Sequence, residues 1–286
     1  MSLFALGLVL VSAVAHATWN LYAKRASGGP AFVWLFDVAS TVLYAPLALI
    51  VVLRPHEPIT LLGFGFIAGS AVLHLAYFLM LQQGYRIGDL SLVYPLARGT
   101  GPMLSASAAI IFFGERPGPL AIGGAALIGV GTFFLAGGGG SMRQASARRA
   151  ILFALATGGI IAAYTLWDKR AVSSLGIPPL LLNWSLGLGR VGLLAPYALR
   201  QRAKIATIWR SYRREVLVVA TLSPLSYILV LTALAFTPVS YVAPAREISI
   251  LIGVLLGTQL LAEGHTRQRL IAAGAMVLGV VGLALG

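Results

Sequence analysis

Long runs of apolar residues, separated by short polar segments, dominate the chain. Ten such runs can be traced, at residues 2–23, 31–53, 61–83, 89–113, 118–137, 149–168, 178–199, 215–235, 238–262 and 270–285. Most are long enough to supply the roughly 20 apolar residues with which a helix crosses a bilayer. Leu, Ala, Gly, Val and Ile follow one another without the period-two alternation of membrane β-strands. The pattern predicts an all-α membrane protein with ten transmembrane helices.

Composition agrees with this interpretation. Hydrophobic residues make up 58% of the 286 residues and charged residues 10%, with a mean hydropathy of +0.89; soluble domains have a very different balance. The chain has no cysteine, which excludes disulfides and thiolate chemistry. The net charge is +13, but most Lys and Arg lie between the apolar runs, where such residues orient the chain and contact lipid headgroups. Nucleic acid is therefore not expected as a partner.

The first five runs recur, in order, in the last five. AHATWNLYAKRA at residues 15–26 matches IAAYTLWDKRA at residues 161–171. Further matches, at separations between 145 and 150 residues, are Trp34 with Trp184, Tyr77 with Tyr227, SLVYPLAR at 91–98 with SYVAPAR at 240–246, and Glu115 with Glu263. We therefore expect an N-terminal five-helix repeat at 1–140, a linker at 141–148 and a C-terminal five-helix repeat at 149–286.

The first run also contains Ala15-His16-Ala17, which has the small-x-small pattern of a signal-peptide cleavage site. Its counterpart lies in the middle of the chain, where no signal peptidase would act, and no basic segment precedes the first run. We therefore expect a retained helix. Because five is an odd number of crossings, the second repeat must enter the bilayer from the opposite face. Inverted repeats around a central cavity are a common plan of secondary transporters that work by alternating access.

The two halves resemble a known family. Each ends its fourth helix in a glutamate, in FFGERPGPLAIGGAALIGVG and in LLAEGHTRQRLIAAGAMVLGVVG. In this the chain resembles, over nearly its whole length, the EamA group of the drug/metabolite transporter superfamily, and within it the YddG-type exporters of aromatic and other amino acids. The resemblance implies a multi-pass protein of the inner membrane whose helices 1 to 4 and 6 to 9 line a cavity, with helices 5 and 10 outside.

Polar residues at membrane depth are costly, so those on the cavity-lining helices are candidate substrate contacts. On the first helix His16, Trp19 and Asn20 share one face, and Tyr164 and Trp167 occupy the matching region of the sixth helix. These rings could stack on a planar or apolar substrate while polar edges bind its ammonium and carboxylate groups. Helix packing and an interfacial aromatic belt are the alternatives.

The third helix presents His74, Tyr77 and Phe78 on one face, and the eighth helix carries Tyr227. Lining of the cavity is the favoured interpretation; a buried histidine with satisfied hydrogen bonds is the alternative. The fourth and ninth helices each carry a Tyr or Ala before a proline, in Tyr94-Pro95 and in Ala243-Pro244, the latter two residues after Tyr241. Prolines bend helices, so Pro95 and Pro244 are either gating hinges or static kinks.

Three charged residues follow these prolines inside apolar runs: Arg98, Arg246 and Glu247. Each arginine could hold a substrate carboxylate by two hydrogen bonds or pair with an acid of another helix, for which Glu247 and Asp37 are available. Energy coupling is open as well. The first helix lacks the acid on which proton-driven members of the superfamily rely, so proton antiport and downhill export both remain possible.

Membrane orientation follows from the basic residues between the runs. The loops after the odd-numbered helices contain 14 Lys and Arg, and the other loops contain four. Six of the 14 lie in one basic connection, residues 200–215. The positive-inside rule makes this side cytoplasmic, which leaves both termini outside.

We therefore expect a secondary transporter that exports small amphipathic metabolites, with amino acids favoured and aromatic ones first. A multidrug or lipophilic-cation exporter, or a lipid-intermediate flippase, is the alternative on the same fold. An intramembrane enzyme is disfavoured, because Gly88-Asp89 lacks the Gly-x that precedes it in aspartyl proteases and no HExxH is present. We predict no catalytic residues, metal or cofactor. The expected partners are the small-molecule substrate and membrane lipid, with protons an open possibility, and a monomer is expected to suffice.

Overall fold

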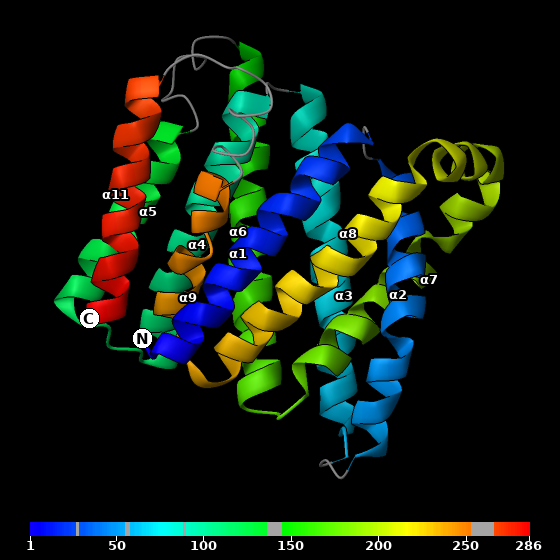
Figure 1. The fold of residues 1–286 in the computed structure, drawn as a ribbon, viewed down its shortest axis with the longest axis horizontal. Coiled ribbons are helices and arrows are strands. Elements are labelled where there is room, and N and C mark those ends of the chain that lie inside the picture. The colour runs from blue at the N-terminus through cyan, green and yellow to red at the C-terminus, as the bar shows by residue number, and fades with distance from the viewer. Residues whose placement is uncertain (27–28, 55–57, 88–89, 136–144, 253–265) are drawn as a thin grey trace.

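Long helices joined by short turns form the described part of the protein (Figure 1). The computed structural model describes residues 1–286 apart from 27–28, 55–57, 88–89, 136–144 and 253–265. The helices are α1 (Leu3–Arg25), α2 (Pro30–Leu53), α3 (Leu61–Ile87), α4 (Leu90–Phe113), α5 (Pro119–Leu135), α6 (Ala145–Ser173), α7 (Pro179–Arg200), α8 (Arg202–Phe236), α9 (Val239–Ala245) and α11 (Thr266–Leu285). The all-helical prediction is confirmed.

Apolar helices with apolar outer surfaces identify a multi-pass membrane protein. Among the described residues, six helices are long and apolar enough to cross a bilayer: α1, α2, α3, α4, α6 and α8. Large hydrophobic side chains such as Leu61 and Phe112 are exposed on the outside. Such a surface is unfavourable in water and suited to lipid tails.

Local sequence sets several of the helix boundaries. Pro30 and Pro179 begin α2 and α7, where the missing amide hydrogen costs nothing and the fixed φ favours a helix. Gly114 and Gly176 follow α4 and α6 with φ of 66° and 63°. Residues with a side chain rarely adopt a positive φ, so glycine allows the chain to turn sharply at both points.

Helices from the two sequence halves pack on one another throughout. α1 packs on α8, α2 on α7 and α8, α3 on α6, and α4 on α6 and α9. α5 and α11 form a separate pair at one edge of the bundle, and the N- and C-termini lie at the same end (Figure 1). The centre is therefore built by both halves, with α5 and α11 away from it.

The structure corrects two sequence-based boundaries. The ninth apolar run, 238–262, is not one helix: α9 ends at Ala245, a turn follows at 246–247, and the helix resumes at 248–252 before the residues that are not described. Pro244 lies in the last turn of α9, just before the break.

The basic stretch 200–215 is helical rather than a loop, because α8 begins at Arg202. Between residues 202 and 214 this stretch has no Pro or Gly and several strong helix formers. Ile208 and Tyr212 also pack on the apolar cluster around Phe32. Tyr212 has the non-helical angles φ −131° and ψ 27°. The first part of α8 therefore bends away from the bundle at the end opposite the termini (Figure 1).

Candidate functional site

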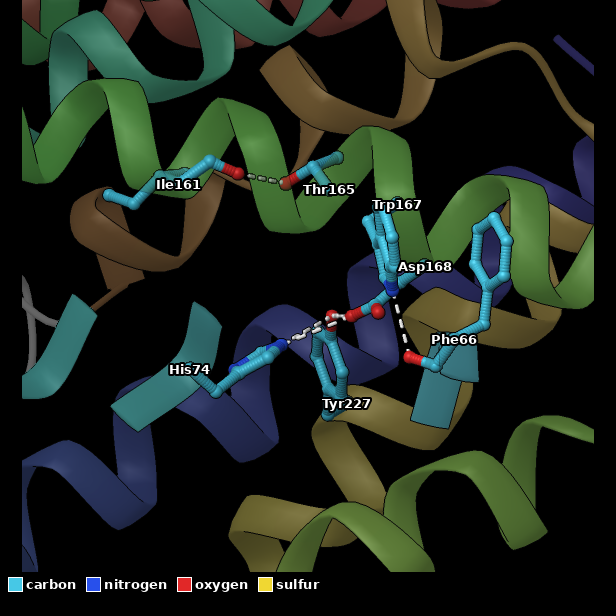
Figure 2. Close-up of polar contacts among 7 residues, drawn as sticks. All are labelled: Phe66, His74, Ile161, Thr165, Trp167, Asp168 and Tyr227. Carbon is cyan, nitrogen blue, oxygen red and sulfur yellow. Dashed lines mark hydrogen bonds and ion pairs between the residues drawn. The ribbon is translucent and has the colours of Figure 1, made fainter. Parts of the chain in front are cut away.

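Three polar side chains from three helices meet in the centre of the bundle. Asp168 on α6, His74 on α3 and Tyr227 on α8 form what we call the His74 cluster (Figure 2). Nε2 of His74 lies 3.0 Å from Oδ2 of Asp168 and 3.2 Å from the hydroxyl oxygen of Tyr227. The Tyr227 hydroxyl donates a further hydrogen bond to the same carboxylate oxygen. Asp168 is completely buried, so these donors compensate a charge that has lost all its water.

Sequence reasoning missed Asp168 because it ended the sixth helix there, beside the charged pair Lys169-Arg170. α6 continues to Ser173, which places Asp168 more than a turn inside the helix. A signal was available, since residues four apart share a helix face and Tyr164 was already a candidate. Extending that face by one turn leads directly to Asp168.

Aromatic rings surround the His74 cluster. The ring of Tyr164 lies against the imidazole of His74, with centroids 4.1 Å apart and an interplanar angle of 31°. Tyr77 meets Tyr164 edge to face at 5.8 Å, and Tyr227 meets His74 edge to face at 5.2 Å. Three predicted site residues of α3 and α6 thus come together with Tyr227 in one aromatic group. Such a group offers flat apolar faces with polar edges.

The break after α9 places two charged residues beside this group. At the break, the amide of Glu247 donates to the carbonyl of Pro244, and the amide of Ile250 donates to the carbonyl of Glu247, three residues apart in each case. The carboxylate of Glu247 pairs with Arg98 of α4 at 3.3 Å, and both side chains are buried. Of the two uses predicted for Arg98, pairing with an acid is therefore the one observed.

Arg246 has a different environment. Its guanidinium lies over the ring of Tyr227, 5.7 Å from the centroid, as a cation–π contact. Within the described part of the chain its side chain forms no ion pair or hydrogen bond. A permanently charged group without an acidic partner is therefore available beside the aromatic rings.

A small pocket opens next to these charges. The space inside it is about 10 Å³, room for about one water molecule, and its lining comes from α4, α6 and the break after α9: Arg98, Pro102, Ser105, Ile161, Tyr164, Thr165, Ala243, Arg246 and Glu247. Pockets for drug-sized ligands typically have volumes of about 300 to 1,000 Å³. The pocket is thus central and narrow, with the charged residues Arg98, Arg246 and Glu247 in its wall.

A second buried ion pair joins α2 to α7. Asp37 is 1% exposed and accepts hydrogen bonds from Nε of Arg190 at 2.9 Å and from Nη2 at 2.5 Å. This two-pronged geometry suits a guanidinium and a carboxylate. Asp37 therefore does not serve Arg98 or Arg246, as the sequence analysis had allowed. Arg190 was overlooked because it lies within an apolar run without an acid nearby in sequence.

The family follows from comparison with known proteins. The model of the EamA-like transporter family matches residues 3–137 and again residues 148–285.

The chain belongs to the EamA-like transporter family. Its members are membrane transporters of small molecules, which agrees with the absence of a recognised catalytic motif in this sequence. Among solved structures, 29 chains match. One crystal structure is 15% identical, covers 98% of both chains and gives a TM-score of 0.77, which shows a shared fold. No curated protein matches the chain.

Some candidate residues of this EamA-like transporter lie away from the pocket. Trp167 of α6 is partly exposed, stacks on Phe66 at 4.3 Å and donates its Nε1 hydrogen to the Phe66 carbonyl (Figure 2). Tyr241 donates to the carbonyl of Gly286 at 2.9 Å, near the C-terminus. Asn20 donates to the carbonyl of His16 within α1.

For the remaining candidate residues, the structure shows the surroundings of some side chains and only the backbone of others. His16 and Trp19 meet edge to face at 4.9 Å, and Trp19 packs toward the apolar cluster around Phe32. Phe78 is partly buried on α3. The side chains of Tyr94 and Pro95 lie outside the described residues, although the backbone of α4 is helical there.

Proposed function

We propose that this EamA-like transporter exports small metabolites that carry a carboxylate, with amino acids and aromatic side chains favoured. In this proposal it acts as a monomer in the inner membrane, by alternating access between two inverted five-helix halves, 1–140 and 149–286. The observation that carries the proposal is the environment of Arg246. Its guanidinium borders the pocket beside the Tyr227 ring and, within the described residues, has no acidic partner.

The pocket offers complementary groups for each part of an amino acid. A guanidinium binds a carboxylate through two parallel hydrogen bonds, which suits Arg246. Oε2 of Glu247 is buried without a hydrogen-bond partner among the described residues, and it could accept from an ammonium group. The face of Tyr164 lines the same pocket and supports an aromatic side chain.

Alternating access is supported by the size of the pocket and by the break after α9. A space of about 10 Å³ is too small for a substrate with an aromatic ring. Loading therefore requires the lining to separate. In this proposal the segment around Pro244 is the hinge, and Pro95 is its counterpart in the first half. Broken helices that carry binding groups at their break are a recurring feature of secondary transporters.

The charges also distinguish amino acids from lipophilic cations. A cation exporter needs an available acid in its cavity. Each of the three buried acids in the described part of the chain already has a partner: Asp37 has Arg190, Asp168 has His74 and Tyr227, and Glu247 has Arg98. The free Oε2 of Glu247 can therefore accept a hydrogen bond from an ammonium group, but its charge is already compensated by Arg98. The available charge is positive, so we favour an anionic group on the substrate.

A matched pair of substrates tests this role of Arg246. Purified protein in liposomes is assayed for uptake of radiolabelled phenylalanine and of phenylalaninamide, which lacks the carboxylate. We expect the protein to prefer phenylalanine, and Arg246→Gln to raise the KM for phenylalanine roughly ten-fold or more, in line with the loss of a charged hydrogen bond. The KM for the amide should change little.

Arg210→Gln, which removes an exposed charge on the first part of α8, is the matched control and should leave both KM values unchanged. Equal KM increases for both substrates in Arg246→Gln would contradict the assignment of Arg246 to the carboxylate. Absence of amino acid transport, with transport of a quaternary amine instead, would contradict the proposed substrate class.

A further inference from the structure

The charges in the centre of the bundle cancel when the histidines are neutral. Within the described helices and the break after α9 they comprise four buried groups, Asp37, Arg98, Asp168 and Glu247, and two partly buried arginines, Arg190 and Arg246. Two arginines and two acids form direct pairs, Arg98 with Glu247 and Arg190 with Asp37. Arg246 and Asp168 remain, without a direct contact between them.

A single aromatic ring connects the two remaining charges. The hydroxyl of Tyr227 donates to Asp168, and the guanidinium of Arg246 lies over the ring of the same tyrosine. Opposite charges that contact the same buried ring attract each other more strongly than they would in water, because the dielectric constant there is low. With His74 neutral, the negative charge of Asp168 therefore balances the positive charge of Arg246 across the ring of Tyr227.

A proton on His74 changes this balance. With Asp168 as acceptor, Nε2 of His74 carries a hydrogen in the neutral ring, and Nδ1 makes no hydrogen bond within the described part of the chain. A proton that binds to Nδ1 turns the ring into an imidazolium ion, 3.0 Å from the carboxylate of Asp168. Asp168 then has a partner of its own, and the charge of Arg246 is left uncompensated.

We infer that His74 and Asp168 form a proton-binding site whose occupation favours carboxylate binding at Arg246, so that proton and carboxylate cross the membrane together. This inference rests on the proposed function. Arg246 is partly buried, so leaving its charge without a counter-charge is costly, and the substrate carboxylate lowers that cost. The same coupling holds in reverse, since a bound carboxylate neutralises Arg246 and makes a proton on His74 more favourable. The proton binds from water on one side and returns to water on the other, so export by this route runs down the substrate gradient and carries a proton outward with each molecule.

The structure supports joint movement over exchange for a further reason. Proton–substrate exchange by direct competition requires one group that binds either partner, as when an acid binds either a proton or a cation. The acid that lines the pocket, Glu247, already pairs with Arg98, and Asp168 is not among the residues that line the pocket. The proton site and the carboxylate site are therefore separate and interact through Tyr227.

Other charged and titratable groups surround His74. Tyr164 and Asp168 reach it from α6, Tyr227 from α8 and Tyr77 lies on α3 itself. Arg190 on α7 and Arg246 after α9 also interact with it electrostatically, as does Asp37 on α2. Arg190 and Asp37 already pair with each other and contribute little net charge. Arg246 is therefore the group whose balance depends on His74.

Two assays on the same liposomes separate this inference from the proposed function. Counterflow of phenylalanine at equal pH on both sides measures carriage without a proton gradient. Accumulation of phenylalanine under an acid-outside gradient, with the membrane potential clamped by potassium and valinomycin, measures coupling. We expect the wild type to accumulate phenylalanine on the alkaline side, and His74→Gln and Asp168→Asn to lower this accumulation roughly ten-fold while counterflow continues.

Controls separate proton coupling from loss of the fold. The double variant Asp37→Asn with Arg190→Gln removes an equally buried acid together with its partner and should keep the accumulation ratio of the wild type. Tyr227→Phe keeps both His74 and Asp168, so it should retain acid-driven accumulation with a shifted pH dependence. Size-exclusion profiles of all variants in detergent identify any that fail to fold.

The possible results distinguish failure of this inference from failure of the proposed function. Wild-type counterflow without acid-driven accumulation overturns the inference and leaves the proposed function intact. Accumulation toward the acidic side shows proton exchange, and it also overturns the inference. Unchanged accumulation in both folded variants, His74→Gln and Asp168→Asn, removes the assignment of the proton site. Absence of counterflow by a folded wild type overturns the proposed function and this inference together.

Discussion

The carboxylate of Glu115, just after α4, caps the N-terminus of α9 by accepting the amide hydrogen of Val239 at 2.8 Å. Its second oxygen accepts the amide hydrogen of Ser240, also at 2.8 Å. On the other side of the same turn, Nζ of Lys169 donates to the carbonyls of Leu234 and Thr237 at the C-terminal end of α8. An acid at a helix N-terminus and a base at a C-terminus each complement the helix dipole. The turn between α8 and α9 is therefore held from both sides.

Substitution of Glu115 should weaken this turn. Glu115→Gln keeps one acceptor but loses the charge and one of the two amide contacts, which should cost about 1–2 kcal/mol. We expect a lower Tm in detergent, read by size-exclusion chromatography after heating. Glu215→Gln, at a partly exposed position within α8, is the control. A Tm for Glu115→Gln equal to that of the control would contradict a capping role.

The sequence predicted most helix positions because the bilayer imposes a strong rule. Every crossing must satisfy its own backbone hydrogen bonds with apolar side chains outside, and long apolar runs therefore mark helices. A break in the helix is tolerated where other parts of the protein, rather than lipid, surround the backbone. The break at Arg246 and Glu247 is such a place, and a hydropathy pattern cannot distinguish it from a continuous span. The helical start of α8 at Arg202 was missed for the converse reason, since basic residues between apolar runs were taken for a loop.

The kinds of residue in the site could be predicted from the sequence more readily than the partner of each charged residue. His74, Tyr77, Tyr164 and Tyr227 are polar or aromatic residues at membrane depth, and the structure brings them together. The partners of the charged residues come from helices distant in sequence, such as Asp37 and Arg190, which are 153 residues apart. No local pattern encodes such a pair, because it depends on how the helices pack.

Close packing of α5 on α11 depends on glycine. A Cβ atom at Gly124 would lie 2.4 Å from the carbonyl oxygen of Gly279, and the backbone cannot yield easily. We expect Gly124→Ala to separate the two helices and lower the Tm by several degrees, since small residues allow membrane helices to approach closely. Gly123→Ala is the matched control, because a Cβ there meets no atom within 4 Å. Similar Tm values for the two variants would show that the pair tolerates separation.

Trp167 should contribute to stability without contributing to substrate binding. Trp167→Phe retains stacking on Phe66 but loses the hydrogen bond to its carbonyl, at a cost of about 1 kcal/mol. The expected result is a lower Tm with an unchanged KM for phenylalanine in liposomes. Tyr164→Phe provides the contrast, since Tyr164 lines the pocket and a changed KM is expected there. An altered KM in Trp167→Phe would show that Trp167 contributes to substrate binding, as the sequence analysis predicted.

Removing one member of the buried pair Arg98 and Glu247 should destabilise the protein more than replacing both members together. Glu247→Gln leaves the guanidinium of Arg98 without its acid, which should destabilise the protein by about 3–5 kcal/mol. Adding Arg98→Met should recover much of the lost Tm, because the uncompensated charge is removed. Stability is measured by thermal unfolding of both single variants and the double variant, which closes a thermodynamic cycle.

Transport by the double variant of Arg98 and Glu247 then tests whether Glu247 also contacts substrate. If Oε2 of Glu247 accepts from the substrate ammonium, the folded double variant should bind phenylalanine more weakly while binding of 3-phenylpropionate, which lacks the ammonium, stays unchanged. Competition by each compound against radiolabelled phenylalanine measures the difference. Equal loss of both affinities would limit Glu247 to holding Arg98. An unchanged preference with restored stability would remove Glu247 from the substrate site, because the ammonium would then be bound elsewhere in the pocket.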